Sequence, residues 1–276
     1  MPELSTAVER LTLVIEIGGI PVRVNTTDPG FVTMLQDRYA GYVLDSSQTG
    51  SRPAEIEFDV DLSVPTGSNP DEEVRVTRSP DLWTITRGDF RAEWSPSTRR
   101  GRIRQSANPY SIDAVLRITH TLVLARQGGF LMHSASAIRN GRAFLFSGVS
   151  GAGKTTISRL APPDATLLTD EISYVRKRGD GYVAYGTPFT GELAKIGENV
   201  SAPLEALYLL AKGPENRIDP VAPGEAARSV LANMLFFAED EELVQATFHS
   251  AFEFASRVPV RRLTFVPDVR VWELIR

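Results

Sequence analysis

The feature that most constrains the fold is a glycine-rich stretch near the middle of the chain, FLFSGVSGAGKTTI at residues 144–157. Residues 148–155 match the phosphate-binding pattern G-x-x-x-x-G-K-[ST] at every position. The pattern needs a strand before the loop and a helix after it, and the segments Ala143–Phe146 and Thr155–Leu160 fit both requirements. The sequence therefore predicts a P-loop (Walker A) nucleotide site; the alternative is a glycine-rich turn that binds no nucleotide.

Each residue type in this motif has a physical role. The glycines let successive backbone N–H groups point inward at phosphate oxygens, and the following helix presents its positive end. Lys154 can reach the β and γ oxygens as a mobile cation, and Thr155 offers a hydroxyl ligand for Mg²⁺. We therefore expect ATP and Mg²⁺ as cofactors, with the nucleotide held by Gly148, Ser150, Gly151, Ala152, Gly153, Lys154, Thr155 and Thr156.

Composition excludes several other classes of protein. Lys and Arg total 30 against 34 for Asp and Glu, which gives a net charge of -4 and no basic character typical of a nucleic-acid binder. The chain has no cysteine, so disulfides and thiolate metal sites are excluded. The N-terminus does not resemble a signal peptide, and no apolar run approaches the ~18 residues of a membrane span. We expect a soluble cytoplasmic protein with no nucleic-acid or membrane partner.

The first part of the chain is predicted to form a small antiparallel β-rich domain, residues 1–107. Apolar residues alternate with polar ones, as in Ile56, Phe58, Val60 and Leu62, and the breaks at Pro65–Gly67, Ser79–Asp81 and Arg87–Asp89 have turn chemistry. Gly18-Gly19 predicts a hairpin, and a helix is expected over about Phe31–Tyr42. The basic cluster Arg99, Arg100, Arg102 and Arg104 is interpreted as a solvated hairpin face, with an anion-binding patch as the alternative.

The second part, residues 108–276, changes to short apolar strands alternating with helices, which predicts an α/β domain with a mixed sheet. Strands are expected at Phe130–Ile138, Ala143–Ser147, Thr166–Thr169, Ile172–Arg176, Tyr182–Tyr185, Leu204–Leu210 and Val260–Phe265. Helices are expected at Ser111–Arg126, Thr155–Leu160, Gly224–Met234, Glu241–Arg257 and Val269–Ile275.

Two features beside the loop distinguish it from most P-loop proteins. The strand before the loop is predicted to form a hairpin with the preceding strand through Asn140-Gly141, a strong type I′ turn sequence. After the loop helix, the strand Thr166–Thr169 ends in Asp170-Glu171, where a carboxylate that binds Mg²⁺ or accepts a proton would lie.

These features resemble HPr kinase/phosphorylase and its shorter relatives, which share a P-loop fold with ATP-dependent phosphoenolpyruvate carboxykinase. The stretch MHSASAIRNGRAFLFSGVSGAGKTTISRL, residues 132–160, has the family's His, hairpin and P-loop in that order. GVSGAGKTT is also close to the carboxykinase pattern G-L-S-G-T-G-K-T-T. The resemblance covers about Gly129 to the C-terminus, and it is looser beyond Thr190.

The resemblance implies roles for three further residues. His133 would face the γ-phosphate and stabilise charge there, and Asp170 would accept the proton of an attacking hydroxyl, bind Mg²⁺ together with Thr155, or do both. Glu171 stands where the bifunctional enzyme has a second Asp, which puts a phosphorolysis role in doubt. The resemblance also suggests a homo-oligomer.

Other charged residues are open to two interpretations. Glu192, in the segment Tyr185–Glu192, would approach the metal or be an ordinary loop carboxylate. Lys212, Arg217 and Arg228 are candidates for a basic group near the transferred phosphate, or are exposed charges around the turn at Gly213-Pro214.

The leading hypothesis is a Mg²⁺-dependent kinase that transfers the γ-phosphate of ATP to a hydroxyl, on a Ser of a protein or peptide or on a small molecule. The alternatives are a nucleotide-dependent regulatory module without transfer, and ATP hydrolysis coupled to a structural change. The identity of the acceptor is not encoded in any recognisable motif.

Overall fold

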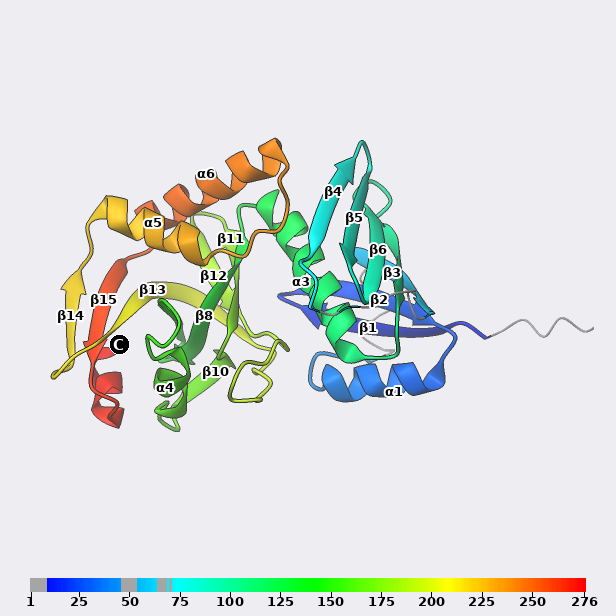
Figure 1. The fold of residues 1–276 in the computed structure, drawn as a ribbon. Helices are drawn as coiled ribbons and strands as arrows, with labels where there is room; N and C mark the ends of the chain where they lie inside the picture. The colour runs from blue at the N-terminus through cyan, green and yellow to red at the C-terminus, as the bar shows by residue number, and fades with distance from the viewer. Residues whose placement is uncertain (1–8, 46–53, 64–68, 70) are drawn as a thin grey trace, which may run out of the picture. The chain divides into compact units, whose positions relative to one another are not determined.

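The computed structural model describes residues 9–45, 54–63, 69 and 71–276 and has a mixed α/β fold with two mixed sheets. Packing divides the chain into two compact units (Figure 1). The N-terminal unit contains Met1–Glu16 and Ile20–Val115, and the C-terminal unit contains Ile17–Gly19 and Leu116–Arg276. The helix α3, Pro109–Ala125, contributes residues to both units.

The N-terminal unit is built on a seven-stranded sheet of order β1-β2-β3-β7-β6-β5-β4. Alternating apolar residues such as Phe58 and Val60 give each inner strand one buried face. The elements are β1 Leu11–Ile17, β2 Ile20–Thr26, α1 Pro29–Arg38, β3 Ile56–Leu62, β4 Arg75–Ser79, β5 Leu82–Arg87, β6 Phe90–Ser95 and β7 Arg100–Gln105.

The prediction of a purely antiparallel sheet in this unit is wrong. β3 pairs in parallel with both β2 and β7. Parallel neighbours need a long crossover connection, and the chain supplies one between β2 and β3 that contains α1. The hairpin at Gly18-Gly19 is confirmed, α1 ends at Arg38 rather than Tyr42, and the predicted turn at Pro65–Gly67 lies outside the described residues.

The basic cluster lies on a charge-balanced face of this sheet, as the solvated interpretation expects. Alternate residues of β7 place arginines beside carboxylates of β3, and the register pairs are Arg100–Glu57, Arg102–Asp59 and Arg104–Asp61. Two of these pairs are also ion pairs, at 3.3 Å for Arg100–Glu57 and 3.7 Å for Arg104–Asp61. The compensating carboxylates remove the excess of positive charge that an anion patch would need.

The C-terminal unit contains an eight-stranded sheet of order β10-β8-β11-β12-β13-β15-β14, with β9 paired to β8 and β13. Its strands are β8 Phe130–Arg139, β9 Arg142–Ser147, β10 Ala165–Thr169, β11 Ile172–Arg178, β12 Gly181–Tyr185, β13 Ser201–Lys212, β14 Arg217–Pro220 and β15 Val260–Phe265. Its helices after α3 are α4 Lys154–Arg159, α5 Pro223–Asn233 and α6 Glu241–Arg257, followed by a 3₁₀ helix η1 at Val269–Leu274.

Every strand and helix expected in this region is present, with two differences. The short polar strand β14 lacks an apolar pattern and was not predicted, and the last helix is 3₁₀ rather than α. The type I′ hairpin between β8 and β9 is confirmed, since Asn140 and Gly141 have φ of 53° and 74°. Among the described residues, no helix has the length and apolarity to cross a membrane.

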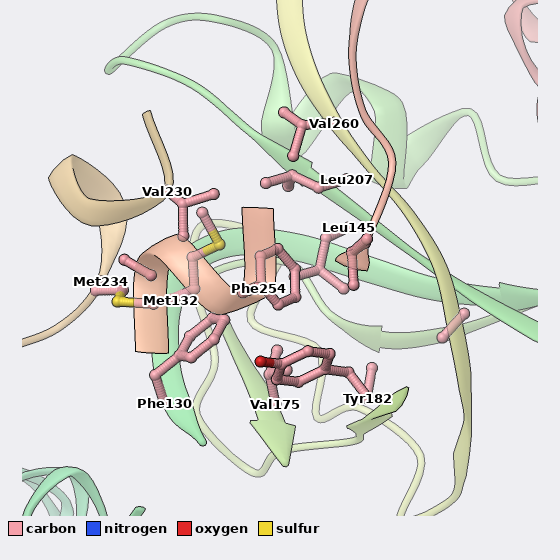
Figure 2. Close-up of a cluster of buried hydrophobic side chains, with 14 of the residues drawn as sticks. Phe130, Met132, Leu145, Val175, Tyr182, Leu207, Val230, Met234, Phe254 and Val260 are labelled. Atoms are coloured by element: carbon pink, nitrogen blue, oxygen red, sulfur yellow. The ribbon is translucent and has the colours of Figure 1, made fainter. Parts of the chain in front are cut away.

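One face of this sheet packs on α5 and α6, and the other carries α4 and η1 (Figure 1). On the α6 side, Phe254 makes edge-to-face contacts with Phe130 of β8 and Tyr182 of β12, with ring centroids 5.1 Å and 4.9 Å apart (Figure 2). Because side chains alternate along a strand, burial of Phe130 and Met132 on this side turns His133 toward the α4 side.

The buried His120 of α3 gives the unit a pH-dependent stability. Its Nδ1 lies 2.8 Å from the Tyr174 hydroxyl, and burial, with a smaller effect of the Arg176 charge, lowers the pKa of His120 from 6.5 to about 3. Between these values the unfolded chain binds the proton that the folded state excludes. We expect the free energy of unfolding to fall as pH is lowered from 6.5 toward 3, by at most about 1.4 kcal/mol per pH unit.

Urea unfolding at a series of pH values measures this slope. His120→Asn keeps a polar partner for Tyr174 and removes the titrating group, so the slope should shrink. His249→Asn, at an exposed position of α6, is the control for the substitution itself. Equal slopes in the wild type and in His120→Asn would contradict the assignment.

Candidate functional site

The glycine-rich loop lies between the end of β9 at Ser147 and the start of α4 at Lys154. Two of its glycines have no room for a side chain. A Cβ on Gly148 would lie 2.8 Å from the Cβ of Ala152, and one on Gly153 would lie 2.7 Å from the Phe265 ring. Gly153 also has φ of +112°, a conformation that other residues rarely adopt. The loop geometry therefore depends on these glycines.

Helix α4 is short and is fixed from its far side. It spans six residues, Lys154–Arg159, and Pro162-Pro163 follow soon after its end. The indole Nε1 of Trp272 in η1 donates a hydrogen bond of 3.1 Å to the Ile157 carbonyl. The Trp272 ring also packs edge-to-face on Phe146 of β9, with centroids 5.4 Å apart. These contacts hold the start of α4 in place beside the end of β9.

A cavity of about 360 Å³ opens between this loop and the strands on either side. It is lined by His133, Ser150, Gly151, Gly153, Lys154, Thr155, Thr156, Arg159, Asp170, Glu171, Gly191, Glu192 and Lys212. All three residues predicted to be catalytic and most of the predicted nucleotide ligands therefore line one cavity. Gly148 and Ala152 do not line it; the Gly148 carbonyl accepts a hydrogen bond from the Lys154 ammonium, and the Ala152 N–H donates to the Val149 carbonyl.

Asp170 is held by backbone donors. Its side chain is buried, with Oδ1 accepting a 2.9 Å hydrogen bond from Gly191 N–H and Oδ2 a 2.9 Å bond from Leu193 N–H. A Cβ on Gly191 would lie 2.8 Å from Asp170 Oδ2, so this approach requires glycine. Each carboxylate oxygen retains a further lone pair for a metal or a proton. The adjacent Glu171 accepts a bond from Ser134 N–H through its carbonyl, at 3.0 Å.

Thr155 and Glu192 form the third part of the site. The Thr155 hydroxyl donates a 3.1 Å hydrogen bond to Glu192 Oε2. Of the two open interpretations of Glu192, the one that placed it beside the predicted metal ligands agrees with this contact. Within the described ranges no group of three His, Asp or Glu side chains is arranged to hold a metal. A Mg²⁺ ion here would take one or two protein ligands, such as Thr155 and Asp170, and complete its shell with water and substrate oxygens.

The charge on Lys154 affects the pKa of His133. The Lys154 ammonium donates to the carbonyls of Gly148 at 3.0 Å and Val149 at 3.4 Å. Partial burial lowers the pKa of Lys154, although the Glu192 charge opposes this shift. Burial also lowers the pKa of His133, and the Lys154 charge lowers it further. Because the His133 pKa lies below 6.5, its imidazole is mostly neutral at pH 7.

Two further cations line the cavity: Arg159, which was not predicted, and Lys212, which the sequence left open. Arg159 follows Thr155 by four residues, so helical spacing alone places both on one face of α4. Lys212 was one of three basic candidates, and the structure separates them. Arg217 instead pairs with Glu215 at 2.9 Å and Asp219 at 2.8 Å, and Arg228 of α5 does not line the cavity. No sequence pattern distinguished Lys212 from these two.

Comparison with protein families identifies the C-terminal part of the chain. Residues 110–276, more than half of the chain, match the family described as "SynChlorMet cassette protein ScmC". The chain belongs to the ScmC family. The matched region includes the whole cavity. Comparison with curated proteins gave no match.

Comparison with solved structures gave a similarity to the Hpr(Ser) kinase/phosphatase from Coxiella burnetii. This ScmC family member is 10% identical to it, and the alignment covers 49% of this chain and 84% of that chain with a TM-score of 0.26.

The loop glycines can be tested by stability. Gly153→Ala should lower the free energy of unfolding by about 1–3 kcal/mol, because the backbone is strained for alanine and the methyl group meets Phe265. Gly151 is the matched control, since its φ of +76° is also positive but its Cβ would enter open space, and Gly151→Ala should cost about 1 kcal/mol. Urea unfolding of both variants measures the difference; an equal or larger loss in Gly151→Ala would contradict the steric role of Phe265.

The coupling between His133 and Lys154 can be measured by NMR titration of the histidine rings, of which the chain has three. The His133 pKa should lie below 6.5, and it should rise in Lys154→Met because the neighbouring positive charge is gone. The ring resonances of His249, which lies outside the cavity lining, serve as the internal control that the fold is the same in both proteins. A His133 pKa that falls or stays unchanged in Lys154→Met would contradict the coupling.

Proposed function

We propose that this protein is a Mg²⁺-dependent, ATP-binding kinase of the P-loop type that transfers the γ-phosphate to a hydroxyl group. The observation that carries the proposal is that six residues of the loop and the start of α4 line one cavity together with Asp170 and His133. The proposed core is of the HPr kinase and phosphoenolpyruvate carboxykinase type, with the β-rich N-terminal unit beside it in the chain.

The residues present fit a triphosphate. The loop is open on its cavity side, since nothing lies within 4 Å of a Cβ built on Gly151, and its backbone can approach phosphate oxygens closely. The Lys154 ammonium is bonded to carbonyls rather than to a carboxylate, so it can turn to a phosphate without breaking an ion pair. The N-terminus of α4 adds its partial positive charge.

The residues present also fit Mg²⁺, with Thr155 and Asp170 as the protein ligands and Glu192 as the acceptor that holds the Thr155 hydroxyl. When bound, Mg²⁺ would neutralise phosphate charge and orient the terminal phosphate. Asp170 suits this position because its carboxylate is fixed by two backbone N–H groups before any ligand arrives. Preorganised groups of this kind lose little freedom at the moment of reaction.

In the proposed transfer, the acceptor oxygen forms a bond to the γ-phosphorus while the bond from that phosphorus to the β–γ bridging oxygen breaks. The electron pair of the broken bond stays on ADP, and the acceptor proton moves to Asp170 and then to water. His133 donates a hydrogen bond to a phosphoryl oxygen as a neutral imidazole, because its pKa is lowered. Its role is therefore directional hydrogen bonding rather than the supply of positive charge.

The proposed acceptor is a Ser of a protein or peptide, with a small-molecule hydroxyl as the alternative. The N-terminal unit, residues 1–107 in the sequence-based division, is proposed to bind the acceptor or to mediate assembly into a homo-oligomer, and the proposed location is the cytoplasm. A regulatory module that binds ATP without transfer is the competing function, and the experiment below separates the two.

Asp170→Asn should lower phosphate transfer about a hundredfold or more, because the proton acceptor is lost while the loop and Lys154 remain. Transfer is measured with radiolabelled ATP and candidate peptides or proteins, and calorimetry should show that the variant still binds ATP. The amide also presents N–H to one of the two backbone donors, so the melting temperature must be recorded to separate loop disorder from lost chemistry.

Glu171→Gln is the matched control for this experiment, because Glu171 is the neighbouring carboxylate and lines the same cavity. It should retain more transfer than Asp170→Asn, whereas Lys154→Met should weaken ATP binding itself. A fully active Asp170→Asn variant would contradict the role of Asp170 as the proton acceptor. Tight ATP binding by the wild type with no labelled acceptor would favour the regulatory module.

A further inference from the structure

The position of Lys212 relative to the loop follows from the register between β13 and β9. It is the last residue of β13, which runs parallel to β9 with Leu209 opposite Ser147. Lys212 therefore lies three residues past the point where β9 ends and the loop begins, or about 10 Å along the strand. Tyr208 and Leu210 pack in the cluster on the α4 side, and alternation places the Lys212 side chain on that same side.

His133 occupies a comparable position on the opposite flank. It precedes Ser134, which pairs with Ser147 from the antiparallel strand β8. The loop thus has His133 on its β8 flank and Lys212 on its β13 flank. Phe265 of β15, the register partner of Lys212, supports this second flank by packing against Gly153.

The carboxylates that line the cavity lie on a different flank from Lys212. Asp170 and Glu171 follow β10, which pairs with β8, and Glu192 lies in the segment bonded to Asp170 and Thr155. All three carboxylates therefore belong to the β8 flank or the segment beside it. Lys212 is the residue of β13 that lines the cavity, and it brings a positive charge to the other flank.

Lys212 is also distinct among the four lysines of the chain. Lys177 is paired with Glu253 at 2.6 Å, Lys154 donates to two loop carbonyls, and Lys195 is exposed outside the cavity lining. Within the part of the chain that the structure describes, the exposed Lys212 side chain makes neither an ion pair nor a hydrogen bond. Because it also lines the cavity, its ammonium group is available to an anionic ligand.

We propose that Lys212 binds non-bridging oxygens of the terminal phosphate of the donor and makes the site select a nucleoside triphosphate over the diphosphate. This inference rests on the proposed function. The loop amides, Lys154 and the α4 N-terminus hold the inner phosphates beside the end of β9, and Lys212 lies farther out along β13. In an in-line transfer to a hydroxyl beside Asp170, the non-bridging oxygens radiate around the axis from the acceptor oxygen to the leaving oxygen, so one of them can face the β13 flank, where Lys212 stands.

Binding of the terminal phosphate by Lys212 also bears on catalysis, because negative charge is spread over the non-bridging oxygens while the phosphoryl group is transferred. Lys212 donates hydrogen bonds to these oxygens and takes no part in bond making or breaking. It is a specificity-determining residue that distinguishes substrate from product: ADP, which lacks the terminal phosphate, leaves Lys212 without its ligand.

The test compares Lys212→Met with the wild type by calorimetry, using the full chain, Mg²⁺ and two probes, ADP and the non-hydrolysable analogue β,γ-imido-ATP. The Kd for the analogue should rise about tenfold, which is the scale of one charge-assisted hydrogen bond, while the Kd for ADP stays within about twofold. Lys195→Met is the matched control and should change neither Kd. Lys212→Arg should recover most of the preference, and equal melting temperatures check the fold.

The outcomes separate this inference from the proposed function. If both nucleotides weaken equally in Lys212→Met, the lysine acts on the inner phosphates or through its general field, and the inference is wrong. If neither changes, Lys212 is a solvated surface lysine, and the inference is again wrong while nucleotide binding stands. Failure of the wild type to bind either probe would instead overturn the proposed function, and the inference with it.

Discussion

The site depends on the pairing of β9 between two strands of opposite direction. β8 is antiparallel to β9, and β13 is parallel to it. The last residue of β9, Ser147, therefore has Ser134 of β8 on one side and Leu209, near the end of β13, on the other. Residues far apart in the sequence, such as His133 and Lys212, are thereby brought to the same cavity. The loop and α4 lie between these flanks. Trp272 donates a hydrogen bond to the Ile157 carbonyl of α4, and Phe265 packs beside Gly153 of the loop.

A second constraint links the carboxylates to the segment after β12. Gly191 and Leu193 donate their N–H groups to Asp170, and the residue between them, Glu192, reaches Thr155. One buried carboxylate thus orders the backbone that places the next carboxylate. Displacement of residues 191–193 would disturb Asp170 and Glu192 together, so these two carboxylates are structurally coupled.

Much of the lining of this cavity could be predicted from the sequence, because it comes from short contiguous motifs. The loop motif, the Asn140-Gly141 turn and the strand that ends at Asp170 are contiguous patterns with few structural solutions. The parallel pairing of β3 and the presence of Lys212 in the cavity depend instead on which strands become neighbours, and no local pattern encodes that. The strand β14 escaped prediction because Arg-Ile-Asp-Pro is short and polar, and it is held by its partner β15.

Charge balance explains why a metal belongs to the proposed function. The cavity is lined by three cations, Lys154, Arg159 and Lys212, and by three carboxylates, Asp170, Glu171 and Glu192, while His133 is neutral. Such a cavity offers little net attraction to a triphosphate, and the acidic flank repels it. A divalent cation bound on that flank reverses the local sign without displacing the lysines. Under the proposed function, this arrangement would favour a metal–nucleotide complex over free nucleotide, with Asp170 as a ligand of the metal and Lys212 as a partner of the terminal phosphate.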